Sequence, residues 1–284
     1  MNIGIYTNLN RDINGQVAKK LINQINNFND ISYKLAYFGE NIFEGKYLAN
    51  IDSLKEIVKC SDIIIAIGGD GTVLQVVQYA SQKNIPVLGI NAGHLGYLTH
   101  INANDELVNM VISLLYENKY TVEERSMLES NIIGTNKKHY SLNEILVMRD
   151  VNLHVAKIKI FIDNSLADEF TGDGVMVATP TGSTAYSLSC GGPVLSPSVK
   201  AFVINALCPH ILHGRPIVVD ENSSIRLEIS LESSNVYLAN DGNIIKTNFN
   251  KVALLVKKSK KALKLIKLQE NNFYNTLLRK LNYA

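Results

Sequence analysis

Aliphatic runs and helix-period segments alternate over the first 120 residues of the chain. Aliphatic runs without polar alternation, typical of strands buried on both faces of a sheet, lie at residues 3–6, 63–67 and 87–90. Apolar side chains recur at helical spacing over residues 17–28, 73–80 and 107–115. Strands that alternate with helices form parallel sheets with crossover helices. We therefore expect residues 1–120 to form an α/β domain, a Rossmann-like parallel sheet with flanking helices.

The pattern changes near residue 121, where short β-type runs separated by Gly, Asn, Asp and Ser replace the helical periods. The clearest runs lie at residues 158–162, 217–219, 225–231 and 236–239. We expect residues 121–250 to form an all-β, β-sandwich-like domain. Residues 251–284 predict strands at 252–256 and 263–268 and a closing helix at 273–281. We assign this last segment to the first domain, although periodicity does not decide where it packs.

Composition limits the class of protein. Apolar residues make up 46% and charged residues 19% of the chain, an ordinary globular balance. A formal net charge of +2 is too small to indicate a polyanion-binding surface, so we expect no nucleic-acid partner. The start of the chain lacks the pattern of a secretory signal, and the longest aliphatic run is far shorter than the about 20 residues that span a bilayer. We expect no membrane segment.

The cysteines and histidines show no pattern of a disulfide framework or of a zinc site. Cys60, Cys190 and Cys208 are an odd number and have no C-x-x-C spacing. Cys208 lies near His210 and His213 in the sequence, but no fourth ligand is apparent. We therefore expect no metal ligands among these side chains, and a cytoplasmic location.

One glycine-rich turn combines the features of a phosphate-binding loop. Gly68-Gly69-Asp70-Gly71-Thr72 follows the predicted strand at 63–67 and precedes the predicted helix that Val73 begins. Unpaired amides and the positive end of a helix dipole attract phosphate there, and glycines allow close approach and a curved nest of amides. We expect Gly68, Gly69, Gly71 and Thr72 to handle phosphate, with Thr72 as the helix cap.

The aspartate in this turn needs a separate explanation, because its charge repels the ligand that the amides attract. We expect Asp70 to be a general base, since phosphoryl transfer commonly uses one carboxylate to accept the proton of the attacking hydroxyl. The alternative is a tight turn in which Asp70 only caps the helix, a role worth about 1 kcal/mol. The turn by itself leaves both open. The sequence contains no P-loop motif, and Gly89, Gly93 and Gly96 lack the spacing of the dinucleotide fingerprint.

Further motifs in both domains add to this turn. They are residues 91–99 (NAGHLGYLT), Asn143-Glu144, residues 171–175 (TGDGV), residues 178–186 (ATPTGSTAY) followed by Gly191-Gly192-Pro193, and Asp241-Gly242. With these segments the chain resembles the NAD kinase (ATP-NAD kinase) family of bacterial type, over residues 3–266. The most specific segment is the Thr- and Gly-rich stretch from Asp173 to Tyr186.

This resemblance implies an activity and its substrates. The family transfers the γ-phosphate of ATP to the 2′-hydroxyl of the adenosine ribose of NAD, which gives NADP, and a divalent cation such as Mg²⁺ assists. By resemblance, Asp70 is the general base, and Asn143 with Glu144 holds the adenosine half of NAD. The chemistry agrees, because a carboxylate accepts hydrogen bonds from ribose hydroxyls and an amide can pair with an adenine edge. The resemblance also implies a homodimer or a homotetramer.

The resemblance extends to a set of NAD-binding positions. They are Asp70, Gly71, Tyr97, Asn143, Glu144, His154, Thr171, Asp173, Thr181, Thr184, Ala185, Tyr186, Ser187, Leu188, Ser189 and Asn243. Two of them depart from the family. Asn243 stands where glutamine is usual and reaches one methylene less far, and Tyr97 stands where phenylalanine is more common and keeps the ring on the adenine side.

Two other functions share part of this pattern. A lipid or sphingoid-base kinase has the same Gly-Gly-Asp-Gly turn, but a lipid acceptor has no use for Asn143, Glu144 and Asp173. A non-catalytic NAD(P) sensor would keep the pocket and would not need Asp70. The sequence leaves open ATP against polyphosphate as donor, NAD against NADH, and feedback by NADP.

Overall fold

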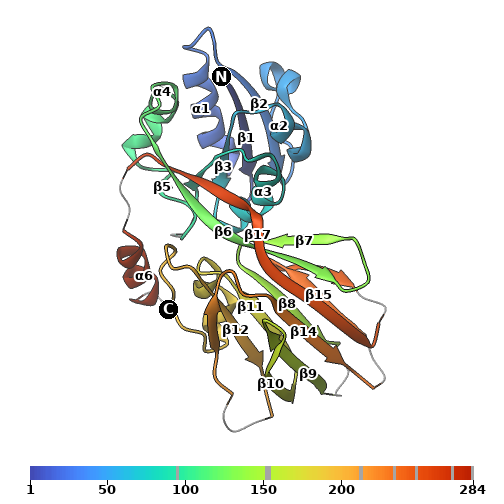
Figure 1. The fold of residues 1–284 in the computed structure, drawn as a ribbon. Helices are drawn as coiled ribbons and strands as arrows, with labels where there is room; N and C mark the ends of the chain where they lie inside the picture. Colours follow the sequence, from blue (N-terminus) through green and yellow to red (C-terminus); the bar gives the residue numbers. More distant parts are fainter. Residues whose placement is uncertain are drawn as a thin grey trace. The chain divides into compact units, whose positions relative to one another are not determined.

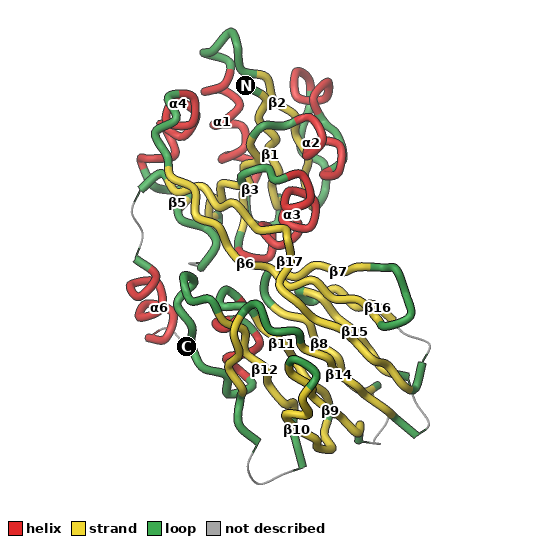
Figure 2. Tube along the Cα trace, in the orientation of Figure 1, coloured by secondary structure: helices red, strands yellow, loops and turns green. Residues whose placement is uncertain are grey.

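The computed structural model describes residues 1–93, 96–150, 155–210, 214–232, 235–246, 249–269 and 272–282. The chain divides into two compact units, Met1–Glu124 with Leu263–Ala284, and Arg125–Ala262. Figure 1 shows their elements in chain order, and Figure 2 shows that helices are concentrated in the first unit and strands in the second. No helix among the described residues is long and apolar enough to cross a membrane.

A parallel sheet forms the centre of the first unit. Its strands are β1 (Asn2–Asn8), β2 (Ser32–Phe38), β3 (Ile63–Gly68), β4 (Val87–Asn91) and β5 (Ile101–Asn102). They lie in the order β2-β1-β3-β4-β5, and each neighbouring pair is parallel. The aliphatic runs of the sequence are therefore strands covered on both faces, and the predicted parallel α/β unit is confirmed.

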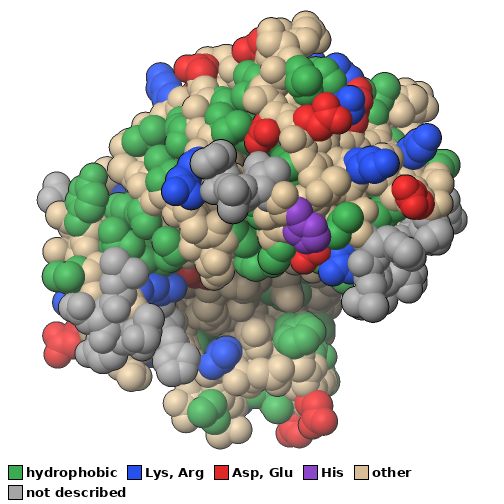
Figure 3. Space-filling view, turned by 90° about the horizontal axis from the view of Figure 1, so that it is seen from below, with side chains coloured by type: hydrophobic (Ala, Val, Ile, Leu, Met, Phe, Trp, Pro, Cys, Tyr) green, Lys and Arg blue, Asp and Glu red, His purple; other side chains and the backbone are tan. Residues whose placement is uncertain are grey.

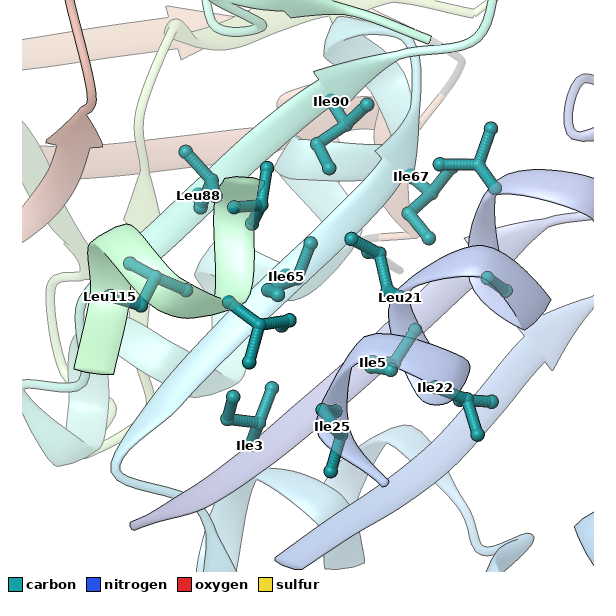
Figure 4. Packing of buried hydrophobic residues seen from close by; sticks show 14 of the residues in the cluster. Ile3, Ile5, Leu21, Ile22, Ile25, Ile65, Ile67, Leu88, Ile90 and Leu115 are labelled. Carbon is teal, nitrogen blue, oxygen red and sulfur yellow. The ribbon is translucent and has the colours of Figure 1, made fainter. Parts of the chain in front are cut away.

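Helices cover both faces of this sheet. They are α1 (Gln16–Ile25), α2 (Leu54–Cys60), α3 (Asp70–Lys83) and α4 (Val111–Tyr116), with short 3₁₀ turns at Ile13–Gly15, Gly45–Asn50 and Glu106–Met110. Side chains of α1 and α4 share one buried cluster with alternate residues of β1, β3 and β4, as Figure 4 shows for Leu21, Ile65 and Leu115. Helices α2 and α3 pack on the other side of these strands (Figure 1). The helix expected at 107–115 is a 3₁₀ turn followed by α4.

Two long strands belong to both units. β6 (Thr121–Ile132) and β17 (Lys251–Lys267) run from one unit into the other. The end of β17 pairs in parallel with β4 through Leu265 and Val87 in the first unit. The sequence predicted two strands here, which is wrong: the lysine-rich segment 257–261 interrupts the apolar pattern but remains extended, because exposed lysines are compatible with a strand. The closing helix, α6 (Phe273–Asn282), is confirmed and belongs to the first unit.

Two antiparallel sheets form the second unit. One has the order β13-β12-β11-β8-β15-β16 and the other contains β10-β9-β14-β17. Their remaining bounds are β7 (Lys138–Ser141), β8 (Glu144–Arg149), β9 (Ala156–Ile162), β10 (Ser165–Gly172), β11 (Gly174–Ala178), β12 (Ala201–Leu207), β13 (Ile217–Asp220), β14 (Ile225–Ser230), β15 (Val236–Asn240) and β16 (Asn243–Lys246). β7 pairs with β6.

The two sheets of this unit share one buried core. Ile145, Val177 and Phe202 of the first sheet pack in the same cluster as Ile160 and Leu227 of the second. Along β9, buried residues alternate with exposed lysines, the period expected when one face of a sheet is covered. The expected all-β domain is confirmed, and its two sheets are antiparallel. A 3₁₀ turn (Gly182–Thr184) and the short helix α5 (Tyr186–Ser189) interrupt it where the Thr- and Gly-rich motif lies.

Candidate active site

Asp70 is the first residue of α3, directly after strand β3. Gly69 is the N-cap, and the amide of Thr72 donates to the carbonyl of Gly69. The expectation that Thr72 caps a helix beginning at Val73 is therefore wrong, because the helix begins three residues earlier and buries Thr72 in its first turn. Gly68 is needed for this geometry, since a Cβ there would overlap the Thr72 side chain. Asp70 thus stands among the amides that a helix N-terminus leaves unpaired.

A loop after β4 holds the Asp70 carboxylate. The backbone amide of Tyr97 donates to Oδ2 at 2.8 Å and that of Leu98 donates to Oδ1 at 2.9 Å. Gly96 lies against the carboxylate so closely that a Cβ would overlap it. The buried hydroxyl of Thr99 faces the same position and has no hydrogen-bond partner among the described residues. The carboxylate is therefore fixed in orientation beside a buried hydroxyl that has no partner among the described residues and that a ligand can satisfy.

The second unit contains a buried carboxylate, that of Glu144. Glu144 begins β8 and is only 8% exposed. Its Oε2 atom has no hydrogen-bond partner in the part of the chain that the structure describes. Burial, and then the nearby charge of Asp241, raise the pKa of Glu144 to about 7. A buried carboxylate with a free acceptor is suited to a hydroxyl donor that a ligand brings.

The backbone around Glu144 is fixed by Asp241. The carboxylate of Asp241 accepts from the amides of Leu142, Asn143 and Glu144 at 2.8, 2.7 and 3.2 Å. Burial raises the pKa of Asp241, while these three amides act in the opposite direction. The Asp241-Gly242 motif therefore has a definite structural role, because it orients the Asn143–Glu144 pair.

The Thr-rich motif supports the same turn from its other side. The hydroxyl of Thr179 donates to the carbonyl of Leu142 and accepts from the amide of Gly182. A Cβ on Gly182 would overlap the backbone of Asn143. Thr181 is buried and accepts from Nη1 of Arg125 at 3.4 Å. The motif brings residues 179–182 and 142–144 together, although they are far apart in the sequence.

Asp173 lines a separate cavity of about 430 Å³ in the same unit. Nε of Arg149 donates to Oδ1 of Asp173 at 2.6 Å, and this hydrogen bond holds the pKa of Asp173 below its usual value. Tyr186, which is 47% exposed, and Ser189 also line the cavity. Three of the predicted dinucleotide-binding residues therefore share one cavity with polar and aromatic walls, as ligand sites commonly do.

The remaining predicted contacts differ in accessibility. Ser187 is fully buried and donates to Oδ1 of Asn205, which gives its hydroxyl a structural partner. Thr184 donates to the carbonyl of Thr181, and Asn243 is exposed at the start of β16. Thr171, Ala185 and Leu188 are half-buried. His154 lies outside the described residues. The roles of these residues in ligand binding stay predictions.

The sequence analysis did not identify two residues of these clusters, Arg149 and Lys280. Arg149 carries no motif signal, because nothing in the sequence relates it to Asp173. Lys280 lies on α6, and its Nζ is 3.8 Å from Oδ2 of Asp70. The sequence offers no sign of this ion pair, because the two residues are 210 positions apart along the chain.

The described residues contain no group of three or more His, Cys, Asp or Glu side chains that could hold a metal ion. Mg²⁺ in nucleotide-using enzymes usually keeps waters and binds one or two carboxylates together with substrate phosphates. The donor set of this chain is compatible with a cation that the phosphates of a nucleotide hold, and not with a cage made by the described side chains alone.

Two segments of this chain match models of known protein families. Residues 50–120 match the family model of the ATP-NAD kinase N-terminal domain, and residues 142–268 match that of the ATP-NAD kinase C-terminal domain. The chain is therefore a phosphotransferase that contains these two domains.

Individual relatives make the assignment narrower. The NAD kinase of Caldanaerobacter subterraneus subsp. tengcongensis is 36% identical over 98% of both chains. That of Clostridium tetani is 35% identical over 98% of this chain and 97% of its own. This chain belongs to the NAD kinase family.

Solved structures show the same fold. The yeast NADH kinase complexed with NADH matches with a TM-score of 0.85 and 25% identity, over 100% of this chain and 88% of its own. An NAD kinase from Archaeoglobus fulgidus in complex with ATP matches with a TM-score of 0.75 and 22% identity, over 100% of both chains.

Proposed function

We propose that this protein transfers the γ-phosphate of ATP to the 2′-hydroxyl of the adenosine ribose of NAD, which gives NADP. The observation that carries the proposal is the 36% identity, over 98% of the chain, to a relative named NAD kinase. The residues of the resemblance support it, because in each unit they fold into clusters with the chemistry that the reaction needs.

Asp70 is the base of this reaction. Its carboxylate takes the proton of the ribose hydroxyl, the hydroxyl oxygen attacks the γ-phosphorus of ATP, and the bond from the β–γ bridging oxygen to that phosphorus breaks to release ADP. The two amides that hold Asp70 fix its orientation, and the N-terminus of α3 favours the phosphate groups. Gly68, Gly69, Gly71 and Thr72 supply this turn.

The second unit supplies the contacts to NAD. Glu144 accepts a hydrogen bond from a ribose hydroxyl through its unpaired oxygen, and the amide of Asn143 pairs with the adenine. The cavity beside Asp173, with Tyr186 and Ser189, receives a further part of the dinucleotide. A divalent cation such as Mg²⁺, held by the phosphates of ATP, would neutralise part of their charge. No side chain of the described clusters is assigned as its ligand.

Substitution of the base tests the proposal. Purified wild-type protein with NAD, ATP and Mg²⁺ should form NADP above a heat-killed control, as measured with an NADP-specific dehydrogenase. Asp70→Asn should lower kcat by at least about 10²-fold, the usual scale for a general base, and should leave NAD affinity largely unchanged. The amide keeps the size of the side chain, removes its charge and basicity, and replaces one of the two oxygens that accept from the amides of Tyr97 and Leu98 with an NH2 donor.

Other outcomes separate the alternatives. Unchanged turnover in Asp70→Asn would contradict the role of base. NAD binding by a wild-type protein that forms no NADP would indicate a sensor. Phosphorylation of a sphingoid base in place of NAD would indicate a lipid kinase. The buried carboxylate of Glu144 has no role in binding such a substrate.

We also propose a cytoplasmic homodimer or homotetramer. Exposed Cys60 and Cys208 are free thiols, which fits a reducing compartment. Light scattering should give two or four times the mass of one chain.

On the face shown in Figure 3, the described lysine and arginine side chains are scattered among uncharged ones, so that this face offers no broad attraction for a polyanion.

A further inference from the structure

The C-terminal helix α6 brings a cation to the proposed catalytic base. Nζ of Lys280 lies 3.8 Å from Oδ2 of Asp70 and 4.4 Å from the centroid of the Tyr97 ring. The ring of Phe273, at the start of the same helix, lies 5.9 Å from the Tyr97 ring. Helix α6 is thus in contact with both the base and the loop that holds it.

The helical repeat explains why α6 touches this loop twice. Phe273 and Lys280 are about two helical turns apart and therefore lie on one face of α6. Phe273 packs against the Tyr97 ring at an interplanar angle of 38°, and the Lys280 ammonium lies over the same ring. Cation–π and aromatic contacts both stabilise this arrangement. Together they fix the ammonium beside Asp70.

The position of the ammonium leaves its hydrogen-bonding capacity available. A separation of 3.8 Å allows charge attraction to Asp70 but is too long for a hydrogen bond. The oxygens of Asp70 accept from the amides of Tyr97 and Leu98 instead. The side chain of Lys280 is 33% exposed, so that a ligand can reach it. An ammonium so placed can donate to an anionic group next to the base.

The ammonium of Lys280 can offset the repulsion between Asp70 and the phosphates of ATP. The carboxylate of Asp70 repels the phosphates of ATP, although the reaction requires both at one place. A lysine within ion-pair distance offsets this repulsion. Lysine and arginine side chains that contact a transferring phosphoryl group also stabilise the charge that develops on its oxygens.

We propose that Lys280 is a further catalytic residue of the phosphoryl-transfer site, where its ammonium contacts the phosphoryl group that passes from ATP to the hydroxyl beside Asp70. This inference rests on the proposed function. Lys280 takes no part in the proton transfer, since the proton of the hydroxyl goes to Asp70 and the electron pair of the broken bond leaves with ADP.

The test compares four full-length proteins. Lys280→Met keeps most of the apolar stem and removes the charge, and Lys280→Arg keeps the charge. Arg279→Met is the matched control, because Arg279 is an exposed cation one position earlier on the same helix. Compared with wild type, Lys280→Met should lower kcat by about 10²-fold with NAD affinity within about twofold, Lys280→Arg should recover at least about tenfold of this loss, and Arg279→Met should match wild type.

A binding measurement separates this inference from the proposed function. In calorimetric titrations on the Asp70→Asn background, which slows turnover, with ATP or NAD added singly, Lys280→Met should weaken ATP binding about tenfold and leave NAD binding unchanged. If wild type forms no NADP, the proposed function fails, and the ATP titration still tests whether Lys280 contacts the phosphates. Thermal unfolding checks that each variant is folded, and Lys280→Gln replaces Lys280→Met if that variant is not.

Three results would overturn the inference. The first is equal turnover of Lys280→Met and Arg279→Met. The second is a loss in Lys280→Met that Lys280→Arg does not recover, since this would indicate packing in place of charge. The third is a gain in activity or in NAD affinity on removing Lys280, which would mean that α6 covers the site.

Discussion

The carboxylates proposed for the active site differ in their surroundings, and each environment fits a different proposed task. Asp70 is held by two amides and lies near a lysine, so that it stays fixed at the helix N-terminus. Asp173 is paired with Arg149, which favours its charged form. Burial raises the pKa of both Glu144 and Asp241, and the charge of Asp241 raises the pKa of Glu144 further. Of these four, only Glu144 has a buried acceptor atom without a partner among the described residues.

The raised pKa of Glu144 predicts a pH-dependent stability. In the unfolded chain the carboxyl releases its proton near 4.5, whereas in the folded protein it keeps the proton up to about 7. The folded state therefore binds more protons between these values, and the resulting stability is present below about 4.5 and is lost as the pH rises through about 7. Glu144→Gln should be more stable than wild type at pH 8, by up to about 3 kcal/mol.

Denaturant unfolding at pH 5 and at pH 8 measures this effect. Wild type should be less stable at pH 8 than at pH 5, and Glu144→Gln should show a smaller difference, with a remainder from Asp241. An equal pH dependence in both proteins would contradict the assignment. Glu144→Gln should also bind NAD more weakly at pH 8, because the amide replaces a charged acceptor with a neutral one.

At the scale of elements, the site depends on close approaches between chain segments. Strand β3 delivers Asp70 to the start of α3, and the loop after β4 supplies the two amides that bind it. Gly96 allows this loop to reach the carboxylate, as Gly182 allows the Thr-rich turn to reach Asn143. In both places a methyl group would occupy the position of a neighbouring atom.

A methyl group on Gly96 should therefore damage the site more than the fold. Gly96→Ala would push a Cβ into Oδ1 of Asp70 and the Thr99 hydroxyl. We expect turnover to fall at least about tenfold and the free energy of unfolding to fall by about 1–3 kcal/mol. Gly93→Ala is the control, because its nearest contact would be Cδ of Arg11 at 3.5 Å, an ordinary distance. Equal turnover of the two variants would show that Gly96 does not position Asp70.

At the scale of the molecule, the residues proposed for the reaction are divided between two units. Asp70 and Lys280 belong to the first unit, and Glu144 and Asp173 belong to the second. Chemistry and NAD recognition should therefore respond to different substitutions. Ligand linkage can measure this separation, because a ligand that binds only the folded protein stabilises it by an amount that its affinity sets.

NAD at about 100 times its Kd should raise the free energy of unfolding by about 2.7 kcal/mol in wild type. Asp70→Asn should show nearly the same increment, since it removes basicity and not the contacts of the second unit. Glu144→Ala should show a clearly smaller increment at the same NAD concentration. Thermal or denaturant unfolding with and without NAD gives the three values. A full increment in Glu144→Ala would remove Glu144 from the NAD site.

Local regularities made most of the fold predictable. The aliphatic runs became strands, and the helical periods became helices, because burial on one or two faces imposes those periods on the sequence. The predictions were wrong where a local rule met a competing one. Thr72 satisfies the preference for a helix cap, yet α3 begins earlier at Asp70, and the lysines of β17 interrupt the apolar pattern without ending the strand.

The sequence by itself determined the α/β unit, the β-rich unit and the motifs that resemble an NAD kinase, because periodicity and short motifs are local properties of the chain. Only the tertiary structure decided that Asp241 orients Asn143 and Glu144, that Arg149 pairs with Asp173, and that Lys280 lies beside Asp70. These contacts join residues that are far apart along the chain. Burial and charge at each site depend on which distant segments meet, and no local pattern records that.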